Sequence, residues 1–104
     1  MAISYLDVVP NPVAQHREVR PFYICVQHSF LDHLRTRVMA PLMATNLPQR
    51  ERLYPHLHIG GQTVFLDPTD LVTMAARHLG DPIFNLGSES FRITAALDLV
   101  FTGV

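Results

Sequence analysis

Two histidines separated by one residue, His56 and His58, come closest in this chain to a metal-binding pattern. In a strand, side chains two positions apart point to the same face, so both imidazoles could face one ion. A zinc site needs three or four ligands, and Asp67 or His78 would have to supply the rest without a recognisable spacing. We interpret the pair as structural, and we expect neither a metal nor any other cofactor.

Nucleophilic chemistry has no supporting motif either. The single cysteine, Cys25, lies within the apolar run 22–26, which predicts a buried and unreactive thiol. Ser88 stands between Gly87 and Glu89, a context that does not match the Gly-x-Ser-x-Gly pattern of a hydrolase nucleophile turn. The chain also has no glycine-rich loop of the kind that holds phosphates. We therefore expect no catalytic residue.

The composition limits the class of partner. The 104 residues form one domain, 1–104, in which 48% are hydrophobic and 16% are charged, below the ~25% charged residues of a typical domain. Eight arginines against nine acidic residues leave a net charge of −1, which disfavours direct nucleic-acid binding. So weakly charged a domain fits a protein that is dimerised or complexed, with a monomer of ordinary surface as the alternative.

Targeting signals are not recognisable in the sequence. No apolar run approaches the ~20 residues that span a bilayer, and the amino terminus does not follow a basic segment with an apolar one. A lone cysteine suits a reducing compartment. We expect a soluble, cytoplasmic protein without a membrane partner.

Short β-branched runs between turn signals predict a small antiparallel β domain with one C-terminal helix. The predicted strands are 3–9, 22–27, 37–42, 57–59 and 63–66, with Gly60-Gly61 as a hairpin turn and the segments 10–20 and 47–52 as connections. Pro41 predicts a sheet edge, a bulge or a strand end, because proline cannot donate to a ladder. Residues 71–76 fit a helix or a strand equally well.

The C-terminal segment has the pattern of an amphipathic helix that stays apolar to its last residue. Its apolar stripe, at spacings of three and four, is Ile93, Leu97, Val100, Phe101 and Val104. Ser88 or Ser90 can cap its start, and Gly103 stands where a helix usually stops. We expect this stripe to be a packing or binding surface.

Four segments occur in the order and spacing of a known family. They are Tyr23-Ile-Cys-Val-Gln27, Arg37-Val-Met-Ala-Pro-Leu42, Leu53-Tyr-Pro-His-Leu-His-Ile-Gly60 and Leu99-Val-Phe-Thr-Gly-Val104. From about residue 22 to residue 104 the chain thereby resembles the CcdB toxin family. The resemblance implies an SH3-like antiparallel β-barrel with a small side sheet, a C-terminal α-helix and a two-fold homodimer, and it favours a strand over 71–76.

The resemblance also implies a function and partners. Members of the family are plasmid-type poisons of DNA gyrase: the toxin binds between the two A subunits of gyrase and traps the gyrase–DNA cleavage complex. They are not enzymes and act by affinity for one conformation. A CcdA-like antitoxin, disordered until it folds on the toxin, neutralises them. Operator DNA is contacted only through the toxin–antitoxin complex.

The gyrase contact implied for this chain comes from an apolar pair after the second strand and from the helix end. These residues are Phe30, Leu31, Asp98, Phe101, Thr102, Gly103 and Val104. Structural roles are the alternatives: Phe101 packed on the barrel, Phe30 and Leu31 facing the core, and Gly103 and Val104 as a plain helix terminus.

Thr102 departs from the family, which has a tryptophan that stacks on a gyrase arginine. Losing such an anchor costs ~2 kcal/mol or more, on the order of 10²-fold or more in affinity. Either Phe101 or Phe30 replaces it, or the target differs, or the protein no longer poisons and acts as an antitoxin-binding co-repressor.

Two further expectations concern other partners. Barrels of this type occur in ribonuclease toxins, and Arg37 with Asp32 or His33 would supply a cation and an acid–base group for RNA cleavage; fold analogy alone does not license that activity. For the antitoxin we expect the loops 9–20 and 43–52 to be the contact regions.

Overall fold

The computed structural model describes residues 2–45 and 50–104. The expected connection 47–52 and the expected antitoxin loop 43–52 thus lie partly outside the described residues. The strands are β1 (Asp7–Pro10), β2 (Phe22–Cys25), β3 (Thr36–Met43), β4 (His56–Ile59), β5 (Gln62–Leu66), β6 (Val72–Ala75) and β7 (Phe84–Asn85). The helix is α1 (Ser90–Phe101), and the short 3-10 helices are η1 (Ala14–His16), η2 (Ser29–Leu31), η3 (Ala76–His78) and η4 (Gly87–Glu89).

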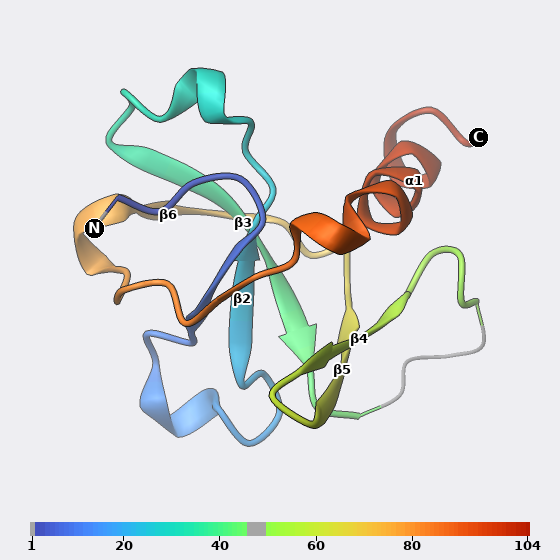
Figure 1. The fold of residues 1–104 in the computed structure, drawn as a ribbon, viewed down its shortest axis with the longest axis horizontal. Coiled ribbons are helices and arrows are strands. Elements are labelled where there is room, and N and C mark those ends of the chain that lie inside the picture. Colours follow the sequence, from blue (N-terminus) through green and yellow to red (C-terminus); the bar gives the residue numbers. More distant parts are fainter. Residues whose placement is uncertain (1, 46–49) are drawn as a thin grey trace.

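The strands form one antiparallel sheet that curls into a nearly closed barrel. The order is β4-β5-β3-β2-β1-β7, and β6 pairs with the first half of β3. Helix α1 follows the last strand and lies beside the β4–β5 hairpin (Figure 1). This architecture, mainly β with one C-terminal helix, confirms the predicted fold class. It also confirms the strand that the family resemblance favoured over 71–76.

Pro41 lies at the point along β3 where the neighbouring strand on one side changes from β6 to β5. On that side β6 pairs with β3 as far as Met39, and β5 begins to pair at Leu42. The carbonyl of Pro41 accepts a bond from the backbone N–H of Asp67 on the same side. Because N and O of one strand residue face the same neighbour, the missing N–H falls in the gap between the β6 and β5 ladders. The predicted sheet edge, bulge or strand end at Pro41 was therefore wrong, since β3 continues through it to Met43 with neighbours on both sides.

One predicted strand start and one predicted helix cap were wrong. The first strand begins at Asp7 rather than at residue 3, because Leu6 has a positive φ of 65° and the chain turns before it. Ile3 and Leu6 are nonetheless buried, so their apolar character reports burial and not an extended strand. The helix begins without a serine cap: Glu89 is the N-cap residue, no side chain caps the turn, and η4 leads directly into α1.

The first half of the apolar face of α1 packs into the core. Ile93 and Ala96 are buried in the same cluster as Val8, Ile24 and Leu66 from the barrel. A second cluster contains Cys25, and burial raises the pKa of its thiol, in keeping with the predicted inert cysteine. None of the described helices is long and apolar enough to cross a membrane.

Candidate protein-binding surface

The second half of α1 leaves the barrel and exposes its apolar side chains. Ile93 is fully buried and Leu97 partly buried, whereas Phe101 is 69% and Val104 82% exposed. The predicted apolar stripe therefore changes role along its length, from core packing to solvent. The alternative in which Phe101 packs on the barrel is wrong.

Hydrogen bonds within the helix end fix Thr102 and Gly103. The backbone N–H of Thr102 and of Gly103 both donate to the carbonyl of Asp98, at 2.7 and 3.2 Å. The Thr102 hydroxyl donates to the same oxygen at 2.8 Å. Gly103 has φ 79°, a left-handed conformation that glycine adopts without penalty and that ends helices. The expected stop at Gly103 is confirmed, and the Thr102 side chain is turned back onto its own helix.

The apolar pair after β2 is also exposed. Phe30 and Leu31 lie in η2, where their side chains are 84% and 43% exposed. The alternative in which they face the core is wrong. At the start of this turn, the Nδ1 atom of His28 accepts a hydrogen bond from the backbone N–H of Phe30 at 3.1 Å. Both parts of the surface that the family resemblance implies are thus accessible.

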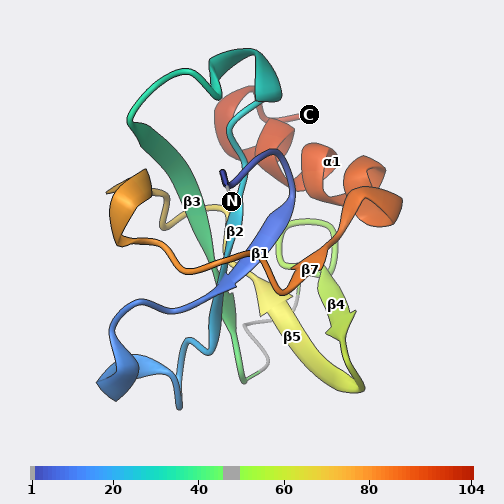
Figure 2. The same cartoon turned by 60° about the vertical axis from the view of Figure 1, so that its left-hand side comes forward.

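Tyr5 links the two parts. Its ring stacks on His28 at 5.8 Å, and the His28 ring lies 4.6 Å from that of Phe30. The hydroxyls of Tyr5 and Thr94 are hydrogen-bonded at 3.2 Å, which ties the row of rings to α1. Figure 2 shows η2, coloured teal, and the C-terminal part of α1 at the same end of the molecule.

Helix geometry extends this surface to the helix end. Thr94, Asp98 and Phe101 are spaced by four and three residues, so they share one face of α1. Tyr5, His28 and Thr94 were not predicted from the sequence to belong to this surface. Tyr5 was assigned to a strand, and an isolated histidine or threonine gives no signal until the fold places it beside the others.

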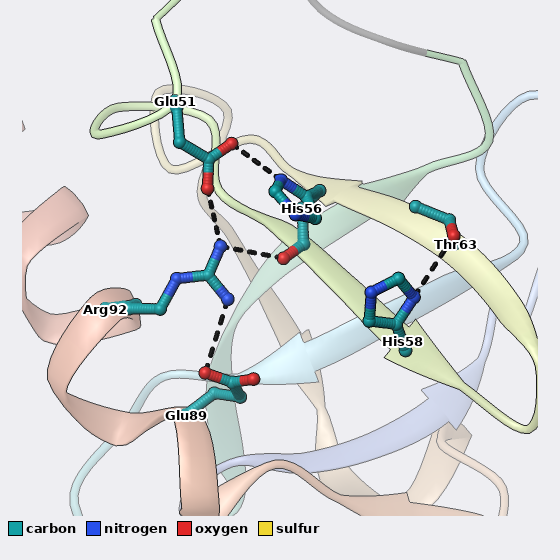
Figure 3. A network of polar contacts seen from close by, with 6 residues as sticks. All are labelled: Glu51, His56, His58, Thr63, Glu89 and Arg92. Carbon is teal, nitrogen blue, oxygen red and sulfur yellow. Dashed lines mark hydrogen bonds and ion pairs between the residues drawn. The ribbon is translucent and has the colours of Figure 1, made fainter.

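The other flank of α1 is fastened to the barrel by charged groups (Figure 3). Glu51 accepts from Nδ1 of His56 at 2.8 Å and from Nη2 of Arg92 at 2.5 Å. Arg92 also donates to the backbone carbonyl of His56 and pairs with Glu89 at 3.3 Å. Burial alone would raise the pKa of Glu51, but the hydrogen bonds and charges of His56 and Arg92 outweigh it and lower that pKa.

Beside this network, between residues 50–55 and α1, lie two adjoining hollows that share Glu51 and Arg52 and that we call the groove. Its apolar lining comes from Leu53, Pro55, Phe91, Ala95 and Leu99. Two arginines, Arg50 and Arg52, line it as well, and their side chains form no ion pair with a described residue. Glu51 and Arg92 also line the groove but are paired with each other, so the groove is mainly apolar and its unpaired charge is positive among the described residues.

The histidine pair has protein partners. His56 binds Glu51, and Nδ1 of His58 is hydrogen-bonded to the Thr63 hydroxyl at 3.1 Å. Asp67 accepts from both the backbone and the hydroxyl of Thr69. Within residues 2–45 and 50–104, no group of three or more histidine, cysteine or acidic side chains is arranged to hold a metal ion.

Arg37 is placed where it cannot meet a substrate. It is 2% exposed, and its guanidinium donates to the backbone carbonyls of Ile3, Asp32, Leu34 and Thr36 at 2.7–3.0 Å. The Asp32 carboxylate in turn accepts from the Ser4 hydroxyl at 2.7 Å. The cation proposed for RNA cleavage is thus occupied in holding residues 32–36 against the amino-terminal segment.

Comparison with known proteins identifies a family and a fold. The family described as CcdB protein matches residues 6–103, nearly the whole chain. No curated protein matches the sequence. A solved structure described as an endoribonuclease from a mycobacterial species is similar, with a TM-score of 0.74 and 14% identity, over 97% of this chain and 92% of that one. At that identity the likeness shows the fold alone.

Proposed function

Because the chain belongs to the CcdB family of toxin–antitoxin toxins, we propose that it poisons DNA gyrase. In this proposal it binds the A subunits of DNA gyrase in the cytoplasm and traps the gyrase–DNA cleavage complex without catalysing a reaction itself. The observation that carries the proposal is the exposure of Phe30 in η2 and of Phe101 and Val104 at the end of α1, each more than two thirds accessible. The two elements lie at the same end of the molecule (Figure 2). Exposed apolar side chains gathered in this way are typical of a binding surface.

Thr102 determines how the surface binds. Its hydroxyl is bonded within the helix, so it offers neither an aromatic ring nor a free donor to a partner. Phe30 and Phe101 are exposed aromatic residues of this surface, and we assign to them the anchoring role of the family's tryptophan. Leu31, Asp98, Gly103 and Val104 complete the contact.

The antitoxin is assigned to the other flank of α1. The groove beside residues 50–55 combines an apolar lining with the free charges of Arg50 and Arg52, which suits an acidic segment with apolar side chains. The loop 9–20 is a second contact region, ordered by Asn11, whose side chain bonds the backbone of Val13 and Arg20. A homodimer and operator binding through the antitoxin belong to the same proposal.

A second candidate function follows from Thr102. If the two phenylalanines do not replace the family's tryptophan, the chain retains antitoxin binding and acts as a non-poisoning co-repressor. A ribonuclease function has less support, because the fold likeness carries no activity and Arg37 is buried among carbonyls.

The experiment is a gyrase cleavage assay with purified protein, supercoiled plasmid and ATP. We expect trapped double-strand breaks with the native chain and more of them with Thr102→Trp, which restores the stacking group. Phe30→Ala should reduce the breaks, and Phe91→Ala is its matched control because both rings are 84% exposed. Breaks with Thr102→Trp alone would favour the non-poisoning homologue, and no breaks with either protein would contradict the gyrase target.

A further inference from the structure

We propose that His28 positions Phe30 for target binding and that Tyr5 couples this position to α1. The inference rests on the proposed function of the surface and adds to it residues that carry no contact role of their own. His28 is a positioning residue because it acts through Phe30. Three features of the structure support this role, one each for His28, Phe30 and Tyr5.

The first feature is the cap. Helix η2 has three residues, so its N-terminal N–H groups depend on a side chain for a partner. His28 supplies that partner through Nδ1, and its backbone carbonyl accepts from Leu31 at 2.9 Å. An Nδ1 atom that accepts a hydrogen bond carries no proton, so this contact needs the neutral imidazole with its proton on Nε2. The histidine therefore fixes the backbone from which Phe30 projects.

The second feature is the ring of Phe30. At 84% exposure this ring lies outside both apolar clusters of the core. The imidazole of His28, 4.6 Å away and tilted by 40°, lies beside it. An exposed side chain that is already ordered loses less conformational freedom on binding. His28 thus presents Phe30 in a restricted orientation.

The third feature is the connection to the helix. Tyr5 stacks on His28 at an interplanar angle of 29°, and its hydroxyl is hydrogen-bonded to that of Thr94. The backbone of Tyr5 is held as well, since its carbonyl accepts from Asn85 at 3.2 Å. The next residue, Leu6, is bonded through its N–H to Cys25 and through its carbonyl to Leu86. A rigid Tyr5 therefore relates the orientation of Phe30 to that of α1.

Three substitutions at His28 separate the cap from the ring. His28→Asn keeps an N-cap acceptor, His28→Phe keeps a ring, and His28→Ala keeps neither. We expect hydrogen exchange of the Phe30 amide, followed by NMR, to be about tenfold faster in the Ala and Phe variants and near native in the Asn variant. His33→Ala, which removes another exposed histidine, is the control and should leave this exchange unchanged.

Gyrase affinity is the second measurement on the same variants. We expect it to fall about tenfold for His28→Ala and less for the Asn and Phe variants, each of which restores one of the two contacts. The double variant Tyr5→Phe with Thr94→Ala should lower gyrase affinity no more than either single change, because both changes remove the same hydrogen bond.

The outcomes distinguish this inference from the proposed function. An unchanged Phe30 amide in His28→Ala would overturn the positioning role, whatever the target. A faster amide with unchanged affinity would overturn its contribution to binding. If the native chain does not bind gyrase, the proposed function fails, while the exchange measurement still decides whether His28 orders Phe30.

Discussion

Arg37 shows how a single residue can look catalytic in the sequence and prove structural. A buried guanidinium with four carbonyl acceptors is a stable arrangement, but removing it leaves those acceptors without donors. We expect Arg37→Met to lower the free energy of unfolding by about 3 kcal/mol or more, measured by urea denaturation. Arg35→Met, at an exposed neighbouring position, is the control and should change it by less than about 0.5 kcal/mol. A small effect of Arg37→Met would mean that the guanidinium is open to solvent and would revive its catalytic interpretation.

Leu6 combines full burial with a left-handed backbone, at φ 65° and 1% exposure. Both Leu6→Ala and Leu6→Gly lose the buried side chain, but only glycine also relieves the left-handed strain. We expect the Gly variant to be more stable than the Ala variant by about 1 kcal/mol. At Leu57, buried in the regular strand β4, the order should reverse. Thermal or urea unfolding of the four variants checks this, and the same order at both sites would contradict the assigned strain.

At the scale of elements, the network around Glu51 fastens α1 to the β4–β5 hairpin. The folded-state pKa of Glu51 is lowered from 4.5, so its contribution to stability is present above about pH 4.5 and is lost as the pH falls through the lower folded value. Glu51 and His56 are exposed and Arg92 is partly exposed, so we expect that contribution to be below about 1 kcal/mol.

Glu51→Gln provides the test of this network. The variant should be less stable than the native chain at pH 6, and the difference should shrink as the pH falls below 4.5, because the native carboxylate becomes neutral as well. Denaturation curves across this range measure it. A difference that stays constant with pH would mean that Glu51 acts by packing rather than by charge.

The elements themselves were largely predictable, because strands bounded by prolines and glycines carry their signal locally. The β2 and β3 segments, the Gly60-Gly61 hairpin and the C-terminal helix all follow from such patterns. The start of β1 was not predictable, since nothing in the sequence marks Leu6 as left-handed. The missing serine cap has a similar cause, because the preceding turn η4 already leads into the helix.

At the scale of the whole molecule, the site was predictable only in part. The family resemblance indicated Phe30 and the helix end, but the row formed by Tyr5, His28 and Thr94 joins segments up to 89 positions apart. Such contacts exist only once the barrel has closed. For the same reason, the apolar stripe of α1 could be recognised in the sequence, whereas the point at which it leaves the core, beyond Leu97, could not.

The two flanks of α1 lead to a prediction about the separation of partners. The surface with Phe30 and Phe101 lies on one side of α1 and is assigned to the target. The groove with Arg50 and Arg52 lies on the other side and is assigned to the antitoxin. We expect Arg50→Glu with Arg52→Glu to weaken antitoxin binding at least tenfold, because charge reversal repels an acidic segment, while trapping of cleaved DNA stays within about twofold. Phe101→Ala should have the larger effect on trapping. In cells, the arginine variant should remain toxic when the antitoxin is co-expressed.

The control for this experiment must reproduce the change in net charge without touching the groove. Arg35→Glu with Arg77→Glu does so, because both residues are exposed and neither lines the groove. If the control weakens the antitoxin as much as the groove variant, the attraction is due to overall charge and not to a local site. If the groove variant loses trapping and antitoxin binding in parallel, one surface serves both partners, and the assignment of opposite flanks is wrong. If only antitoxin binding is lost, the target and the antitoxin use separate surfaces on the two sides of α1.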